Sequence, residues 1–276
     1  MRKLALCLAI TVMVLTGIVL GSRATADESD TPVGPSVVGI HAPCPVTHPW
    51  PGKDVSITKI KEQLAANYGL TLTGNGWSDA HREQIRIVWQ SLDAVACTDF
   101  MATITEKNGQ VGLNAGSIRG YAWGDWSLTK GGHVTFDFAK WAEVMDDKDP
   151  GKLSRLVIHE LTHAWNSDRF GNPAYWREFQ TLAKKEGHFS EYAGSKDTEI
   201  LAETVGYYVA RCAKDNPYDT PRHKAYYEWV RKNVFDGREF GPGPGKKAAC
   251  DVTAEDIAAT TTPSQPAWIK ALTGSE

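Results

Sequence analysis

Hydrophobic positions repeat at helical spacing in two segments of the chain before residue 100. The first predicted helix covers residues 56–67, and its apolar face carries Ile57, Ile60 and Leu64. Residues 71–76 are then predicted to form a turn. Ser78 is the expected cap of a longer helix that ends near Ala96. The apolar face of this second helix is formed by Ile85, Val88, Trp89, Leu92 and Val95.

The pattern changes from helical spacing to alternation after this helix. Residues 100–105 alternate as a strand, and Lys107-Asn108-Gly109 is typical of a hairpin turn. Residues 120–123 and 133–136 are predicted to be further short strands, and a helix is expected to resume after Phe138. These consecutive short strands predict a small antiparallel sheet.

A helix is predicted again after Asp149-Pro150. Asp149 is the expected N-cap, and Pro150 stands at the first helical position, where its missing N–H costs nothing. Gly171-Asn172-Pro173 is the expected end of this helix. Its apolar positions recur at helical spacing and are Leu153, Leu156, Val157, Leu161 and Ala164.

The rest of the chain is predicted to be helical as far as residue 234. The expected helices cover 174–185, 198 to about 214 and a part of 218–234, with a loop at 186–197. The glycine- and proline-rich segment 241–245 breaks the pattern, and residues 251–276 form a polar tail. Helices, a small sheet and then helices again predict an α+β fold that is mainly helical.

The first residues resemble a secretory leader. Arg2 and Lys3 precede an apolar run at 4–20, and Ala24-Thr25-Ala26 is typical of a cleavage site. A signal-anchor is the alternative, but the run is short for a membrane-spanning helix. We therefore expect a signal peptide at 1–26, an extended segment at 27–55, one domain at 56–250 and the tail at 251–276. The expected protein is secreted, with no stable membrane insertion after cleavage.

Charge and cysteine content narrow the expected partners. Three of the 30 basic residues, and no acidic residue, lie in the leader, so 27 basic and 33 acidic residues remain, a net charge of −6. This charge argues against nucleic acid as the main partner. The four cysteines beyond the leader allow three pairings in an oxidising compartment. We favour Cys44–Cys97 with Cys212–Cys250.

The segment His159-Glu160-Leu161-Thr162-His163 carries the pattern H-E-x-x-H. On a helix, residues four apart lie on one face, so both imidazoles can be directed at one metal ion. Such a pair suits Zn²⁺, with Glu160 beside it as general base for a water molecule. A catalytic zinc ion takes three protein ligands, so one more is needed.

The third ligand is expected in the segment 197–206. Glu199, Ala202, Glu203 and Gly206 share one helical face, and the small residues suit close packing against the metal helix. Glu199 would bind zinc, and Glu203 would accept the spare N–H of a ligand histidine. The reversed roles, and His188 as a third histidine ligand, are the alternatives. The pattern with a third histidine shortly after the motif is excluded, because Asn166 and Arg169 occupy those places.

His159-Glu160-x-x-His163 followed by Glu199-x-x-Ala202-Glu203 resembles the gluzincin metallopeptidases. Within them, the chain is similar to the anthrax lethal factor catalytic-domain and Pro-Pro endopeptidase family, from about Ser78 to Val234. That family has a tyrosine seven residues before the ligand glutamate, where this chain has Tyr192. The resemblance implies a zincin-like domain with Glu199 as ligand, Glu203 as its support and Tyr192 as the oxyanion donor. It also implies a sheet edge that receives an extended peptide.

These residues predict a secreted zinc-dependent endopeptidase with one catalytic Zn²⁺ and a peptide or protein as substrate. The alternatives are a zinc-stabilised extracellular binding protein or inactive pseudo-peptidase, and a zinc-dependent cell-wall hydrolase. An intact Glu160 argues against a binding protein, since a structural metal site needs no base. His133 could line the cleft but is more typical of a structural histidine. The crowded aromatic residues Tyr121, Trp123 and Trp126 are expected to pack in the core rather than to line a cleft.

Overall fold

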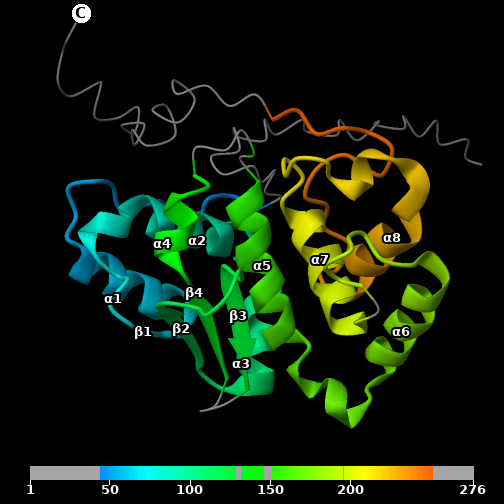
Figure 1. Cartoon of the computed structure of the whole chain (residues 1–276), viewed down its shortest axis with the longest axis horizontal. Coiled ribbons are helices and arrows are strands. Elements are labelled where there is room, and N and C mark those ends of the chain that lie inside the picture. Colours follow the sequence, from blue (N-terminus) through cyan, green and yellow to red (C-terminus); the bar gives the residue numbers. More distant parts are fainter. Residues whose placement is uncertain (1–43, 129–131, 146–148, 150, 195, 251–276) are drawn as a thin grey trace, which may run out of the picture. The chain divides into compact units, whose positions relative to one another are not determined.

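The computed structural model describes residues 44–128, 132–145, 149, 151–194 and 196–250 (Figure 1). The chain forms an α+β fold with a small mixed sheet of four strands. The predicted signal peptide, residues 27–43 of the predicted extended segment, Pro150 and the predicted tail at 251–276 lie outside the described residues. Residues 44–55 contain neither helix nor strand, as expected.

The first two predicted helices are confirmed. α1 (Ile57–Tyr68) begins after Ser56, whose hydroxyl accepts a hydrogen bond from the Lys59 N–H at 3.3 Å, and ends at Gly69 in the left-handed region. The short helix η1 (Asp79–His81) precedes α2 (Arg82–Ala94). The Ser78 side chain makes no capping hydrogen bond, so this residue precedes the helical segment without capping it.

The strand predicted at 100–105 is wrong, because this segment belongs to the helix α3 (Phe100–Asn108). Its buried residues Phe100, Met101 and Ile104 lie at helical spacing, and packing overrides the strand preference of its β-branched residues. The predicted hairpin turn is the end of this helix. There the Lys107 ammonium donates to the Trp165 carbonyl (2.8 Å), and the Asn108 side chain donates to the Ala164 carbonyl (2.9 Å).

The sheet is mixed rather than antiparallel, and its strand order is β1-β2-β4-β3. β1 (Leu70–Thr73), β2 (Val111–Ala115) and β4 (His133–Phe136) are parallel neighbours, and β3 (Gly124–Ser127) pairs with β4 in the antiparallel direction. The segment predicted as a turn at 71–76 thus contains part of β1. The α2–α3 segment forms the crossover that a parallel pair requires. Of the predicted strands, 133–136 is confirmed, and 120–123 precedes the strand that forms.

The predicted helix that carries the histidines is α5 (Lys152–Trp165). Gly151, not Asp149, stands at its N-cap, because the Asp149 carboxylate instead accepts a hydrogen bond from the Lys214 N–H at 2.9 Å. A Cβ on Gly151 would lie 2.2 Å from the backbone nitrogen of Ala213, so only glycine fits here. After Trp165 the chain tightens into η3 (Ser167–Gly171), which ends at the predicted Gly-Asn-Pro stop.

The remaining predicted helices are confirmed with shifted ends. They are α4 (Phe138–Ala142), α6 (Ala174–Glu186), α7 (Asp197–Val209) and α8 (Lys224–Asn233), with η4 (Pro217–Asp219) and η5 (Pro221–His223) before the last. α7 ends before the predicted Lys214. The Asn216 side chain caps it by donating to the carbonyls of Tyr207 (3.0 Å) and Ala210 (3.1 Å).

α5 lies at the centre of the core, where it contacts α2, α3 and β3 on one side and α7 on the other (Figure 1). Both favoured disulfides are confirmed, with Cα–Cα distances of 5.4 Å for Cys44–Cys97 and 5.6 Å for Cys212–Cys250. Disulfides are typical of proteins that mature in an oxidising compartment. Among the described residues, no helix combines the length and apolar character needed to span a membrane.

Candidate metal centre

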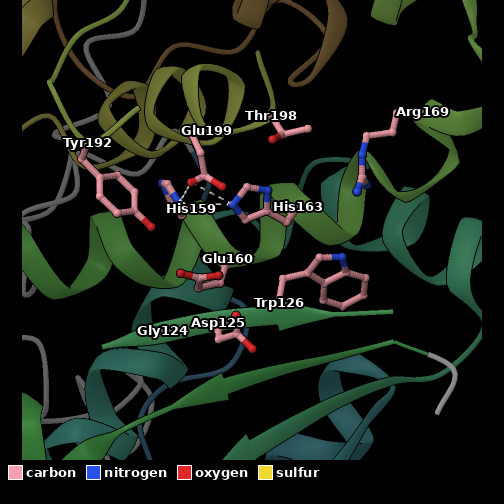
Figure 2. Close-up of a pocket in the computed structure, with 10 residues that line it drawn as sticks. All are labelled: Gly124, Asp125, Trp126, His159, Glu160, His163, Arg169, Tyr192, Thr198 and Glu199. Atoms are coloured by element: carbon pink, nitrogen blue, oxygen red, sulfur yellow. Dashed lines mark hydrogen bonds and ion pairs between the residues drawn. The ribbon is translucent and has the colours of Figure 1, made fainter. Parts of the chain in front are cut away.

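Two helices bring three potential metal ligands together (Figure 2). His159 and His163 lie one turn apart on α5, and Glu199 lies in the first turn of α7. The two Nε2 atoms are 3.3 Å apart, and Glu199 Oε2 lies 3.3 Å from that of His159 and 3.5 Å from that of His163. The described part of the chain contains one such group of His, Cys, Asp and Glu side chains that could hold a metal ion.

The triangle formed by these atoms fits a tetrahedral Zn²⁺. Ligands about 2.0–2.1 Å from zinc at tetrahedral angles lie about 3.3–3.4 Å apart. Glu199 Oε2 is buried and makes no hydrogen bond of good geometry with a described residue, so it can serve as a ligand. Burial, with the charge of His163 as a smaller cause, lowers the pKa of His159 to about 4, which keeps its imidazole in the neutral form that binds metals.

Glu199 is ionised in this arrangement. Burial opposes its ionisation, but the two adjacent imidazoles outweigh burial and hold the pKa of this carboxyl below its ordinary value. Two imidazoles with one carboxylate form the donor set of many zinc sites.

Small residues let α7 approach α5 closely enough to place Glu199. A Cβ on Gly206 would lie 3.0 Å from the Arg155 carbonyl oxygen and 3.7 Å from the His159 Cβ. Ala202 is fully buried one turn earlier. The face of α7 that the sequence suggested therefore does pack against α5.

Glu203 lies one turn after Glu199 and is buried. Among the described residues, its hydrogen-bond donor is the Ser190 hydroxyl, 2.6 Å from Oε1, while Oε2 is buried without a partner. Burial raises the pKa of Glu203, and Ser190 and Arg155 partly offset that effect. The expected support of a ligand histidine by Glu203 stays a prediction.

Glu160 occupies a tight space between α5 and β3 (Figure 2). A Cβ on Gly124 would lie 2.7 Å from both Cγ and Oε1 of Glu160, so the strand touches this carboxylate through bare backbone. Burial, assisted by the charges of Glu199 and Asp125, raises the pKa of Glu160 well above its usual range. A carboxylate with a raised pKa is the stronger base.

Tyr192 stands at the edge of the same pocket, and its hydroxyl is directed towards Glu160 (Figure 2). Its ring centroid lies 6.4 Å from that of His159, and the side chain is 57% exposed. Burial and the carboxylates of Glu199 and Glu160 raise the pKa of Tyr192 to about 12. The phenol is therefore a hydrogen-bond donor at neutral pH.

The other histidine candidates lie outside the pocket. His188 is exposed in the loop after α6, and His133 stands in β4 between β2 and β3. The expectation that the crowded aromatic residues pack in the core is correct in part. Trp123 and Trp126 pack against the core, whereas Tyr121 is 82% exposed. Trp126 also lines the pocket.

Sequence reasoning missed several residues that line the pocket, namely Gly124, Asp125, Trp126, Arg169 and Thr198.

Comparisons of the chain with protein-family models, with curated proteins and with solved structures find no match. The residues of the site can hold a divalent cation, move a proton at Glu160 and donate a hydrogen bond from Tyr192.

Proposed function

We propose that this protein is a secreted zinc-dependent endopeptidase with a zincin-like domain. His159, His163 and Glu199 would hold the zinc ion. The observation that carries the proposal is the convergence of their three ligand atoms, 3.3–3.5 Å apart, beside a buried glutamate on the same helix as the histidines. A structural metal site gains nothing from a buried acid with a raised pKa, whereas hydrolysis needs such a base.

Each residue has a separate task in the proposed reaction. Zinc, when bound, supplies a Lewis acid that acidifies water and polarises the substrate carbonyl. Glu160 takes a proton from the attacking water and later passes it to the departing amine. The Tyr192 hydroxyl donates to the negative charge that develops on the carbonyl oxygen. Gly124 keeps Glu160 close to the sheet, so the base is held in place before the substrate arrives.

The proposed substrate is a peptide or protein in extended conformation. β3 is a terminal strand of the sheet, and Gly124, Asp125 and Trp126 line the pocket beside it. An extended peptide can add to such an edge through main-chain hydrogen bonds. The leader-like residues at 1–26 and the two disulfides support secretion.

The test is a comparison of the zinc-loaded protein with its Glu160→Gln variant on a broad peptide library. We expect the variant to keep stoichiometric zinc and to lose about 10²- to 10⁴-fold in kcat/KM, because the proton acceptor is removed and the ligands are not. Glu178→Gln, at an exposed position on α6, is the matched control and should change neither value.

The outcome also separates the proposal from its rival. Stoichiometric zinc with no cleavage of any peptide by the unaltered protein would favour the zinc-stabilised binding protein. Full turnover by Glu160→Gln would refute the role of Glu160 while leaving hydrolysis in place.

A further inference from the structure

The charges that line the pocket are unevenly distributed. Asp125, Glu160 and Glu199 contribute carboxylates, and Arg169 is the one lysine or arginine among the described lining residues. Arg169 belongs to η3, directly after α5, and its guanidinium points into the pocket beyond His163 (Figure 2). A single cation therefore marks one end of an otherwise acidic pocket.

Within the described residues, Arg169 has no carboxylate partner. Nη1 donates one hydrogen bond to the Asn166 carbonyl (3.2 Å), and the guanidinium lies 4.3 Å over the Phe170 ring. The adjacent Asp168 is engaged elsewhere, with Lys107 at 3.0 Å and with the Tyr175 hydroxyl. A guanidinium carries five N–H donors, so most of those on Arg169 have no acceptor among the described residues.

Four other arginines in the described chain show an alternative, in which the guanidinium pairs with a carboxylate. Arg82, Arg86, Arg211 and Arg231 each pair with a nearby carboxylate. A structural role for Arg169 at the C-terminal end of α5 would use the single bond to Asn166 and would need no access to the pocket. Arg169 is half-buried at the pocket wall and has no carboxylate partner in the described part of the chain, which points to a ligand instead.

A second donor faces the same end of the pocket. Trp126 Nε1 is buried and has no hydrogen-bond partner among the described residues. Figure 2 shows the nitrogen edge of this indole turned towards the Arg169 guanidinium. The ring is held from behind, because a Cβ on Gly132 would lie 2.7 Å from Trp126 Cη2. The Trp126 indole N–H from β3 and the Arg169 guanidinium from η3 thus face the same end of the pocket, and neither has a carboxylate partner among the described residues.

We propose that Arg169 and Trp126 form a subsite for a carboxylate of the substrate, either an acidic side chain near the scissile bond or a free C-terminus. This inference rests on the proposed peptidase function. The planar guanidinium matches a carboxylate with two parallel hydrogen bonds, and the indole N–H adds a third. Phe170 is 75% exposed beside the guanidinium and offers an apolar flank for the methylene groups of the ligand.

The test measures selectivity rather than activity alone. Peptides with Asp or Glu scanned through each position, and their Asn or Gln counterparts, are digested with free and with amidated C-termini. We expect the unaltered protein to prefer the acid at one position, or the free terminus, by about 10- to 100-fold in kcat/KM. Arg169→Ala should abolish that ratio, and Arg169→Glu should reverse it in favour of Lys or Arg. Arg177→Ala, at an exposed arginine on α6 that also donates to a backbone carbonyl, should leave it unchanged.

A reversed preference cannot come from partial unfolding, so Arg169→Glu keeps the test valid if Arg169→Ala is unstable. Trp126→Phe should reduce the ratio by less than Arg169→Ala, because it removes one neutral donor. A missing acid preference, or one that survives Arg169→Ala, overturns the subsite and leaves the peptidase proposal intact. A zinc-loaded protein that cleaves no peptide of either set overturns both. Selectivity for the free terminus in place of an internal acid identifies the chain end as the carboxylate source.

Discussion

The pocket has two walls of different construction. The helical wall, formed by α5 and α7, supplies His159, His163 and Glu199 from positions one helical turn apart or on a facing helix. The strand wall, formed by β3, supplies backbone at Gly124 and the side chains of Asp125 and Trp126. Helical spacing fixes the first wall, and a close approach of the strand to Glu160 fixes the second.

This difference separates two properties of the site. Changes to the three proposed ligands of the helical wall should alter metal affinity and therefore everything that depends on it. Changes in the strand wall, or in the loop that carries Tyr192, should alter turnover while the metal remains bound. Measuring zinc content and kcat together in every variant tests this separation.

The largest effect is expected in the helical wall, for Glu199→Gln. The variant should lose stoichiometric zinc and at least about 10³-fold in kcat/KM, because an amide replaces the one anionic ligand. Zinc analysis after dialysis and peptide hydrolysis measure the two losses, and Glu191→Gln in the adjacent loop is the control. Full zinc in Glu199→Gln together with loss of zinc in Glu203→Gln would transfer the ligand role to Glu203.

Tyr192→Phe should reduce kcat by about 10²- to 10³-fold and leave zinc content unchanged. In the proposed mechanism the phenol donates to the developing oxyanion and is not a ligand, and loss of one such donor has an effect of this size. A parallel loss of zinc would show that the loop stabilises the metal and would break the proposed separation.

Gly124→Ala should reduce kcat by about 10- to 100-fold, and Gly124→Val by more, with zinc retained. The new Cβ would stand 2.7 Å from Glu160 Cγ and Oε1, so the base must move away from its productive position. Gly243→Ala is the control, because a Cβ there meets no atom within 4 Å. Wild-type turnover in Gly124→Ala would show that Glu160 can shift freely, and the strand wall would then have no part in placing the base.

The smallest effect is expected for Ser190→Ala, which removes the hydroxyl that donates to Glu203 at 2.6 Å. Loss of this outer support should weaken zinc binding by about 10-fold, measured by competition with a chelator. Ser56→Ala removes the cap of α1 and should instead cost about 1 kcal/mol of folding stability with no change in zinc affinity. Unchanged zinc affinity in Ser190→Ala would show that zinc binding depends on the three ligands of the helical wall alone. Glu203 would then have no role in the metal site.

The helical wall could be predicted from the sequence because its information is local. His159 and His163 define their common face within one turn, and the small residues Ala202 and Gly206 indicate a helix that packs closely. The sequence allowed three disulfide pairings, and the favoured one is the one that the structure shows. Tyr192 was expected only through its spacing from Glu199 in a known family.

The strand wall could not be predicted because its geometry depends on contacts distant in sequence. No local pattern in the sequence marks Gly124, and its contact with Glu160 arises only when β3 packs on α5. Trp126 resembled a core residue, which it is in part. The same limitation explains α3: the β-branched residues of the segment 100–105 suggest a strand, and the packing of Phe100, Met101 and Ile104 decides for a helix.

The end of α3 has a consequence for how the site opens. Lys107 and Asn108 satisfy the last carbonyls of α5, at Trp165 and Ala164, although α3 contributes no ligand. These bonds cannot break without exposing the end of the helix that carries both histidines. In hydrogen exchange, amides of α3 and of the last turn of α5 should therefore become accessible in one cooperative event. The last turn of α5 would then open with the same free energy as α3, a segment that lies far from the proposed reaction.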